Sequence, residues 1–120
     1  GRPVLEIAAD GFANCDRLEK VVFSGNNLRV INNMAFASCV NLQSFEIPAG
    51  VTALGSYVFN GCDSLKSVSI SATVTSIGQS IFRECPLLET LTVDENNRVY
   101  KSENNCLLER APDDLSGSDE

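Results

Sequence analysis

The chain has 120 residues, of which 43% are hydrophobic and 21% are charged, as is usual for a globular domain. Its formal net charge is −7, and no stripe of lysine and arginine is present. This balance argues against nucleic acid and against an anionic membrane surface as partners, because both are bound through positive charge. No apolar run approaches the roughly 18–20 residues that cross a bilayer, and the first residues do not have the pattern of a signal peptide.

An apolar pattern recurs four times along the chain. The phenylalanines that mark it are 24, 23 and 23 residues apart, and a cysteine follows each of them three positions later. A period of 20–29 residues with a Leu-x-x-Val-x-Ile core is typical of a leucine-rich-repeat solenoid. We predict four stacked rungs, at about residues 4–27, 28–50, 51–73 and 74–96. The columns expected to be buried are Phe12, Phe36, Phe59 and Phe82, and Leu18, Leu42, Leu65 and Leu88.

The repeat contains two kinds of segment with the sequence of a short β-strand. One follows the leucine, at residues 21–24, 45–48, 68–71 and 91–94, and these four segments are predicted to form a parallel sheet face. The other lies at residues 51–54 and 74–77, where Gly55 and Gly78 suit a sharp bend. The stretch from the bend to the cysteine is predicted to form one or two turns of α-helix or 3₁₀-helix.

The chain departs from the repeat after residue 96. Two short β-prone runs around an Asn-rich turn predict a β-hairpin at about residues 97–110, which would cap the last rung. Residues 1–110 are therefore expected to form a single leucine-rich-repeat domain. The acidic tail at residues 111–120 is expected to be flexible.

The motif Ile-Pro-x-x-Val-Thr-x-Leu/Ile-Gly-x-x-x-Phe-x-x-Cys-x-x-Leu-x-x-Val runs through residues 47–68 and returns at 74–91. It resembles the bacterial surface leucine-rich repeat of the BspA type, and the resemblance covers about residues 4–110. The resemblance implies a module for protein interaction or adhesion in a bacterial cell-surface or secreted protein, with a surface protein of a host or neighbouring cell as partner. A structural spacer or stalk is an open alternative, and a carbohydrate-binding module is a less favoured one.

Four of the five cysteines occupy one repeated position. Free cysteine packs as a small apolar group, so Cys39, Cys62 and Cys85 are predicted to be buried, reduced and metal-free. Disulfide bridges between neighbouring rungs are not sterically excluded. Because the C-x₂-C spacing of zinc sites is absent, we expect no metal and no other cofactor.

The sequence offers no catalytic centre. It contains no histidine, the commonest general base. The outward carboxylates of Glu46 and Asp94 are expected about 12 Å apart, beyond the ~5–9.5 Å of glycosidases. We therefore predict that the protein is not an enzyme. The candidate ligand face is the outer surface of the sheet, although a merely solvated sheet would also be polar: Lys20, Val22, Ser44, Glu46, Ser67, Ser69, Thr90, Thr92 and Asp94.

Overall fold

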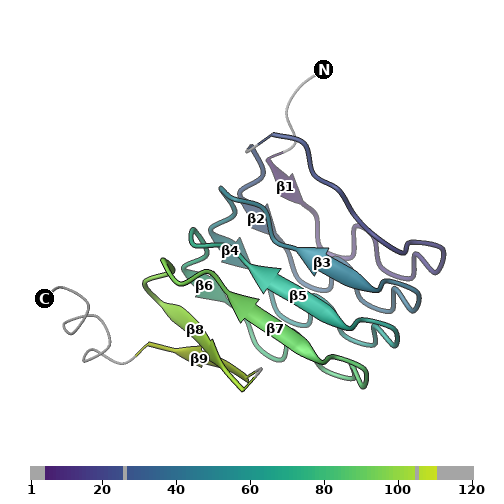
Figure 1. The fold of residues 1–120 in the computed structure, drawn as a ribbon. Coiled ribbons are helices and arrows are strands. Elements are labelled where there is room, and N and C mark those ends of the chain that lie inside the picture. Colours follow the sequence, from purple (N-terminus) through teal and green to yellow (C-terminus); the bar gives the residue numbers. More distant parts are fainter. Residues whose placement is uncertain (1–4, 26, 105, 111–120) are drawn as a thin grey trace, which may run out of the picture.

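The computed structural model describes residues 5–25, 27–104 and 106–110. These residues form a solenoid of stacked parallel rungs that ends in an antiparallel hairpin, which confirms the predicted architecture (Figure 1). One parallel sheet receives a strand from every rung, in the order β1 (Glu6–Ile7), β2 (Val30–Ile31), β4 (Ala53–Leu54) and β6 (Ser76–Ile77). The second sheet contains β3 (Ser44–Glu46), β5 (Ser67–Ile70) and β7 (Thr90–Val93), and the hairpin contains β8 (Tyr100–Glu103) and β9 (Cys106–Glu109).

The first repeat contributes no strand to the second sheet, so the prediction of four strands there is wrong. Residues 21–24 are not in a strand, and among the described residues no backbone hydrogen bond joins residues 20–24 to β3. Two features of this repeat explain the departure. Phe23 stands where the later repeats have isoleucine or valine, and one extra residue precedes Leu28. The ring of Phe23 packs edge-on against Phe45, with 5.7 Å between centroids.

The segment predicted to be helical is a chain of tight turns in every rung, and no helix occurs in the described ranges. Within this chain of turns each rung has two residues with positive φ, four positions apart, and such a residue interrupts a right-handed helix. Along these turns, every second backbone N–H donates to a carbonyl of the next rung instead of to a carbonyl of its own turn. The residues with positive φ in these turns are Asp10, Met34, Tyr57 and Ser80, and Asn14, Ser38, Gly61 and Glu84. The N–H groups of Phe12, Phe36 and Phe59 donate to the next rung over 2.7, 3.0 and 2.9 Å.

The apolar columns are fully buried only in the middle of the stack. Phe36 and Phe59 are each 0% exposed, and their rings stack with 6.0 Å between centroids. Phe82 is half-buried, and Phe12 is 43% exposed. The prediction of a wholly buried phenylalanine column is therefore wrong at Phe12, because none of the described rungs lies on its N-terminal side. The leucine column follows the same gradient, with Leu42 and Leu65 buried and Leu18 and Leu88 partly buried.

Gly55 and Gly78 serve the contact between rungs rather than a bend. Neither has a positive φ. A Cβ atom on Gly55 would lie 2.5 Å from the backbone nitrogen of Asn33, and one on Gly78 would lie 2.6 Å from that of Ser56. Contacts this short do not occur with real side chains, so glycine allows the rungs to approach each other at this corner.

The C-terminal hairpin is fastened to the fourth rung by a buried asparagine. Asn97 follows Val74 by 23 residues and is 1% exposed. Its amide donates to the carbonyls of Ser71 and Val74, at 3.0 and 2.9 Å, and its side-chain oxygen accepts two N–H groups of the following segment. The hydroxyl of Tyr100 accepts the N–H of Ile77 at 2.9 Å. These bonds satisfy backbone groups that a fifth rung would otherwise satisfy.

Candidate functional site

The second sheet presents a flat polar face made of two columns of side chains. Ser44, Ser67 and Thr90 pair directly with one another, and Glu46, Ser69 and Thr92 pair in the next column. The residues between them in each strand are buried, so these side chains point outward. The pairing register is the one expected from the repeat spacing.

The first rung forms a wall beside this face instead of extending it. Lys20 and Val22 were expected to begin the two columns, but they lie on the irregular segment 20–24. Val22 is 81% exposed. This side chain places an exposed apolar group next to the polar face.

A hollow of about 670 Å³ lies over the face and against this wall. Its volume falls within the roughly 300–1,000 Å³ that is typical of ligand sites. Ser67 and Thr90, although predicted, do not line it. The predicted residues that line it are Lys20, Val22, Ser44, Glu46, Ser69, Thr92 and Asp94.

Sequence reasoning missed the apolar end of the hollow. Phe23, Ile47 and Pro48 line it together with Val21. The missed signal is the contrast between repeats, since Phe23 replaces a smaller residue and the first repeat is one residue longer. The hollow therefore combines hydroxyl groups over the strands with an apolar wall.

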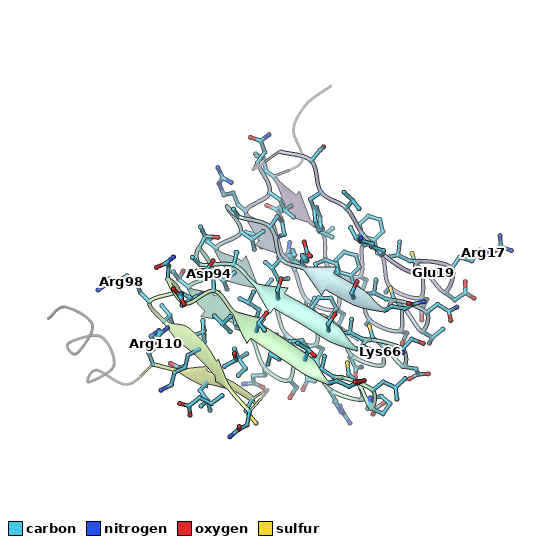
Figure 2. All side chains as sticks on the ribbon, in the orientation of Figure 1. Arg17, Glu19, Lys66, Asp94, Arg98 and Arg110 are labelled. Atoms are coloured by element: carbon cyan, nitrogen blue, oxygen red, sulfur yellow. The ribbon has the colours of Figure 1, made fainter. Side chains whose placement is uncertain are left out.

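The charges of the hollow are few and separated. Lys20 belongs to the wall, Glu46 lies on β3, and Asp94 follows β7. The N–H of Asp94 donates to the carbonyl of Ile70 at 2.9 Å, which anchors the end of this strand. Figure 2 shows Asp94 and Lys66 towards opposite ends of the strands. The two carboxylates stand on rungs two apart, so they do not form a catalytic pair.

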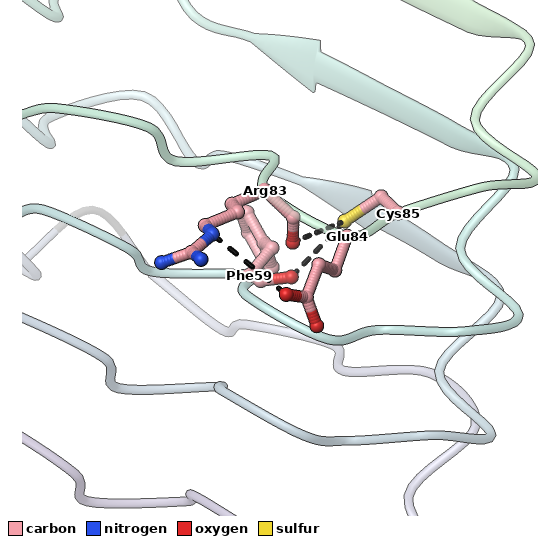
Figure 3. A network of polar contacts seen from close by, with 4 residues as sticks. All are labelled: Phe59, Arg83, Glu84 and Cys85. Carbon is pink, nitrogen blue, oxygen red and sulfur yellow. Dashed lines mark hydrogen bonds and ion pairs between the residues drawn. The ribbon is translucent and has the colours of Figure 1, made fainter.

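The cysteine column on the turn side forms a ladder of hydrogen bonds between rungs. The thiols of Cys39, Cys62 and Cys85 donate to phenylalanine carbonyls of the preceding rungs, at 3.1, 3.2 and 3.0 Å. Figure 3 shows the last of these bonds, from Cys85 to Phe59. Each phenylalanine carbonyl also accepts the N–H of the cysteine in its own rung, over 3.2 to 3.4 Å. The thiol is the second donor to this carbonyl, which gives a structural reason for cysteine at this position.

All five cysteines are free, as predicted for the thiols of the column. Cys39 and Cys62 are buried, as predicted, but the prediction of burial is wrong for Cys85, which is half-buried because the described residues contain no fifth rung to cover its turn. Burial raises the pKa of the Cys39 thiol. The adjacent Cys85 thiol and, next, burial raise the pKa of Cys62. Because the thiolate is the reactive form, these two cysteines are unsuited to nucleophilic catalysis.

The described residues lack the features of two other kinds of site. Within residues 5–25, 27–104 and 106–110, no three side chains of His, Cys, Asp or Glu come together in a way that could hold a metal ion. No described helix is long and apolar enough to cross a membrane.

Comparison with known proteins identifies a family. Residues 4–109 match the family model described as a BspA type leucine rich repeat region. No curated protein matches the chain. Among solved structures, a leucine-rich repeat protein from Eubacterium ventriosum is 26% identical, with a TM-score of 0.67 over 88% of this chain. The leucine rich repeat protein of T. pallidum is 30% identical, with a TM-score of 0.62 over 77% of this chain.

A third similar structure is described as a leucine rich cell surface protein from Faecalibacterium prausnitzii. It is 25% identical, with a TM-score of 0.51 over 92% of this chain. The chain spans only part of these proteins: 34% of the first, 53% of the second and 41% of the third.

Proposed function

The chain belongs to the BspA-type leucine-rich-repeat family, and we propose that it is a non-enzymatic module for protein interaction in a bacterial cell-surface or secreted protein. Its partner is a protein on the surface of a host or neighbouring cell. The observation that carries the proposal is the hollow over the sheet face, which combines paired hydroxyl columns with an exposed apolar wall. The similar structure described as a cell surface protein supports the location.

The size of the face sets the expected affinity. Three strands at ~4.8 Å spacing and four residues of ~3.3 Å each give a footprint of roughly 190 Å². A stable protein interface usually buries about 800 Å² on each partner. The face alone therefore supports weak binding, and a partner of ordinary affinity must also contact the wall formed by residues 20–23.

The non-enzymatic role agrees with the chemistry of the hollow. It holds one lysine and two separated carboxylates, and the chain has no histidine. General acid–base catalysis needs a titratable group within hydrogen-bond reach of the reacting atoms and with a pKa near the working pH. The carboxylate of Asp94 accepts the N–H of Asn96 at 2.8 Å, a local turn contact, and the carboxylate of Glu46 stands two rungs away.

A matched pair of arginine variants tests the ligand face. Ser69 lies on the central strand β5 and lines the hollow, whereas Ser76 is exposed on β6 in the other sheet. We expect Ser69→Arg to weaken binding of the labelled domain to cultured epithelial cells and to other bacteria at least tenfold. Ser76→Arg should leave it unchanged, and both variants should keep the melting temperature. Equal binding by the wild type and Ser69→Arg would mean that the face is not the binding surface.

One observation favours a structural spacer as the second candidate function. None of the described outward residues of β3, β5 and β7 is aromatic, whereas interface anchors are usually Trp, Tyr or Arg. The same feature disfavours a carbohydrate-binding module, because sugars are commonly held on aromatic rings. A spacer would show no saturable binding to either kind of cell, and neither arginine variant would change that result.

A further inference from the structure

The sheet β3-β5-β7 ends at β3 with an unpaired edge. Along a strand, the backbone N–H and C=O of alternate residues point to opposite sides. The N–H of Ile47 donates to Ser69 on β5, at 2.9 Å. The backbone groups of Ser44 and Glu46 therefore face the other way, towards the first rung. In the part of the chain that the structure describes, no backbone hydrogen bond from residues 20–24 reaches them.

The structure itself shows which kind of group fits this edge. The equivalent edge of β5 is covered by β3, and that of β7 is covered by β5, in both cases by a parallel strand in register. On the edge of β3, Ser44 and Glu46 present donors and acceptors at the same spacing, whereas Pro48, at the next outward position, has only an acceptor. No strand covers this edge among the described residues. In Figure 1 the first-rung chain runs away from β3 after its turn. The hollow is lined both by residues 20–23 and by Ser44 and Glu46 of β3.

We propose that an extended segment of the partner protein binds here by strand addition, pairing with the free edge of β3 between that strand and residues 20–23. This inference rests on the proposed protein-binding function and states how the partner's backbone would lie against β3. Donors and acceptors two residues apart in a line match an extended backbone and do not match a helix or a sugar. An unpaired edge strand is a general template for such pairing.

The side chains around the edge indicate the sequence of the bound segment. On the inner side, Val21 and Phe23 are half-buried, so alternate residues of the segment should be small and apolar. On the outer side, the carboxylate of Glu46 is exposed and forms no ion pair among the described residues. The residues between should therefore be polar, with a basic side chain preferred opposite Glu46. Such alternation is what a half-buried strand requires.

A competing occupant is the chain's own segment 20–24, which could close onto β3. Phe23 packs against Phe45 across this gap, so the two segments remain in contact through their side chains. If the segment closed in solution, the amide of Glu46 would be protected from hydrogen exchange in the free protein. That result would overturn the inference.

The first test uses a synthetic peptide with the sequence of residues 64–72, which contains β5. In the fold this sequence occupies the matching place beside β7, and the bond from the N–H of Asp94 to its Ile70 carbonyl shows that the backbone groups of Ile70 face that strand. At β3 the place of Asp94 is taken by Pro48, which has no N–H, so the peptide's Ile70 is expected to contribute its N–H as a donor there. The peptide should bind weakly and saturably and should protect the Glu46 amide. N-methylation at the peptide's Ile70 should weaken binding at least tenfold, and N-methylation at its Ser69 should change it less than twofold. Absent binding, or equal effects of the two methyl groups, would overturn the inference.

The second test changes the protein. Glu46→Pro removes the outward N–H and should leave the ladder with β5 intact, because proline is tolerated on an edge strand. It should abolish peptide binding, whereas Glu46→Ala keeps the N–H and should retain binding within a few-fold. If Glu46→Pro fails to fold, binding of the two methylated peptides to the wild-type protein still tests strand addition. If cell binding is lost in Ser69→Arg but kept in Glu46→Pro, the protein-binding function stands and strand addition is wrong.

Discussion

The two ends of the solenoid are covered differently, although the same repeat builds both. At the C-terminal end, Asn97 and Tyr100 are 1% and 9% exposed. At the N-terminal end, Leu5, Phe12 and Val22 are 57%, 43% and 81% exposed. The hairpin turns one end into a sealed surface, and the other end keeps uncovered apolar side chains.

This contrast shows that the presence of neighbouring rungs, more than the position in the motif, determines how far a residue is buried and how much it stabilises the fold. Phe12 and Phe59 occupy the same motif position, but one is an end residue and the other has a rung on each side. In a repeat protein, stability is approximately a sum of unit terms and nearest-neighbour terms. Equivalent substitutions at the ends and in the middle should therefore differ in cost.

The largest difference is expected for phenylalanine truncation. Phe59→Ala removes a fully buried ring and should lower the free energy of unfolding by about 3–5 kcal/mol. Phe12→Ala removes a ring that is 43% exposed, so its cost should be about 1 kcal/mol. Urea denaturation of both variants measures the two costs. Equal losses would contradict the dependence on neighbouring rungs.

The next effect concerns the sealed end. Asn97→Val restores the type of residue that the repeat has at this position, but it removes the amide donor to the carbonyls of Ser71 and Val74, and the Ser71 carbonyl keeps only the N–H of Val74 at 3.5 Å. It also removes the acceptor of the N–H groups of Val99 and Tyr100. Unsatisfied buried groups cost about 1–3 kcal/mol each, so we expect a loss of about 3 kcal/mol. Amide exchange in β8 and β9 should accelerate more than in β2 and β4. A stabilised Asn97→Val variant would mean that apolar packing, not the amide, closes this end.

Most of the architecture could be predicted from the repeat spacing, because a fixed period places equivalent residues in columns. The position of Asn97 could also have been found by counting 23 residues on from Val74. The conformation of the turns could not be predicted from the sequence, because Met34, Tyr57 and Ser80 adopt positive φ without being glycine. Such residues cost about 1–2 kcal/mol in the left-handed region, and only the rung-to-rung hydrogen bonds explain why they stay there.

The candidate site was predictable as a list of outward residues but not as a hollow. Alternation along β3, β5 and β7 placed Glu46, Ser69 and Thr92 in one column. The wall depends on the departure of residues 20–24 from the sheet, which arises from the bulk of Phe23 and one extra residue. The repeat motif describes what the four repeats share, so it does not predict a departure that occurs in one repeat alone. The role of the hollow in binding a ligand stays a prediction.

A smaller effect is expected where rungs meet in the middle of the stack. Gly55→Ala places a Cβ atom 2.5 Å from the nitrogen of Asn33. Overpacking of this kind costs about 1–3 kcal/mol, and we expect about 2 kcal/mol from thermal and urea unfolding. Ala8 holds the equivalent place in the first described rung and is exposed. Its change to glycine should cost under about 1 kcal/mol. If Gly55→Ala is neutral, the rungs can separate slightly without loss.

The smallest effect isolates one hydrogen bond at the sealed end. Tyr100→Phe keeps the buried ring but removes the hydroxyl that accepts the N–H of Ile77. Ile77 is half-buried, so water can reach part of the group, and we expect a loss of about 1 kcal/mol. Tyr57→Phe is the matched control, because the half-buried Tyr57 hydroxyl forms no hydrogen bond within the described residues. Amide exchange at Ile77 should accelerate in Tyr100→Phe and stay unchanged in Tyr57→Phe. Unchanged exchange in both variants would show that the hairpin seals this end through the Tyr100 ring and Asn97, without help from the hydroxyl.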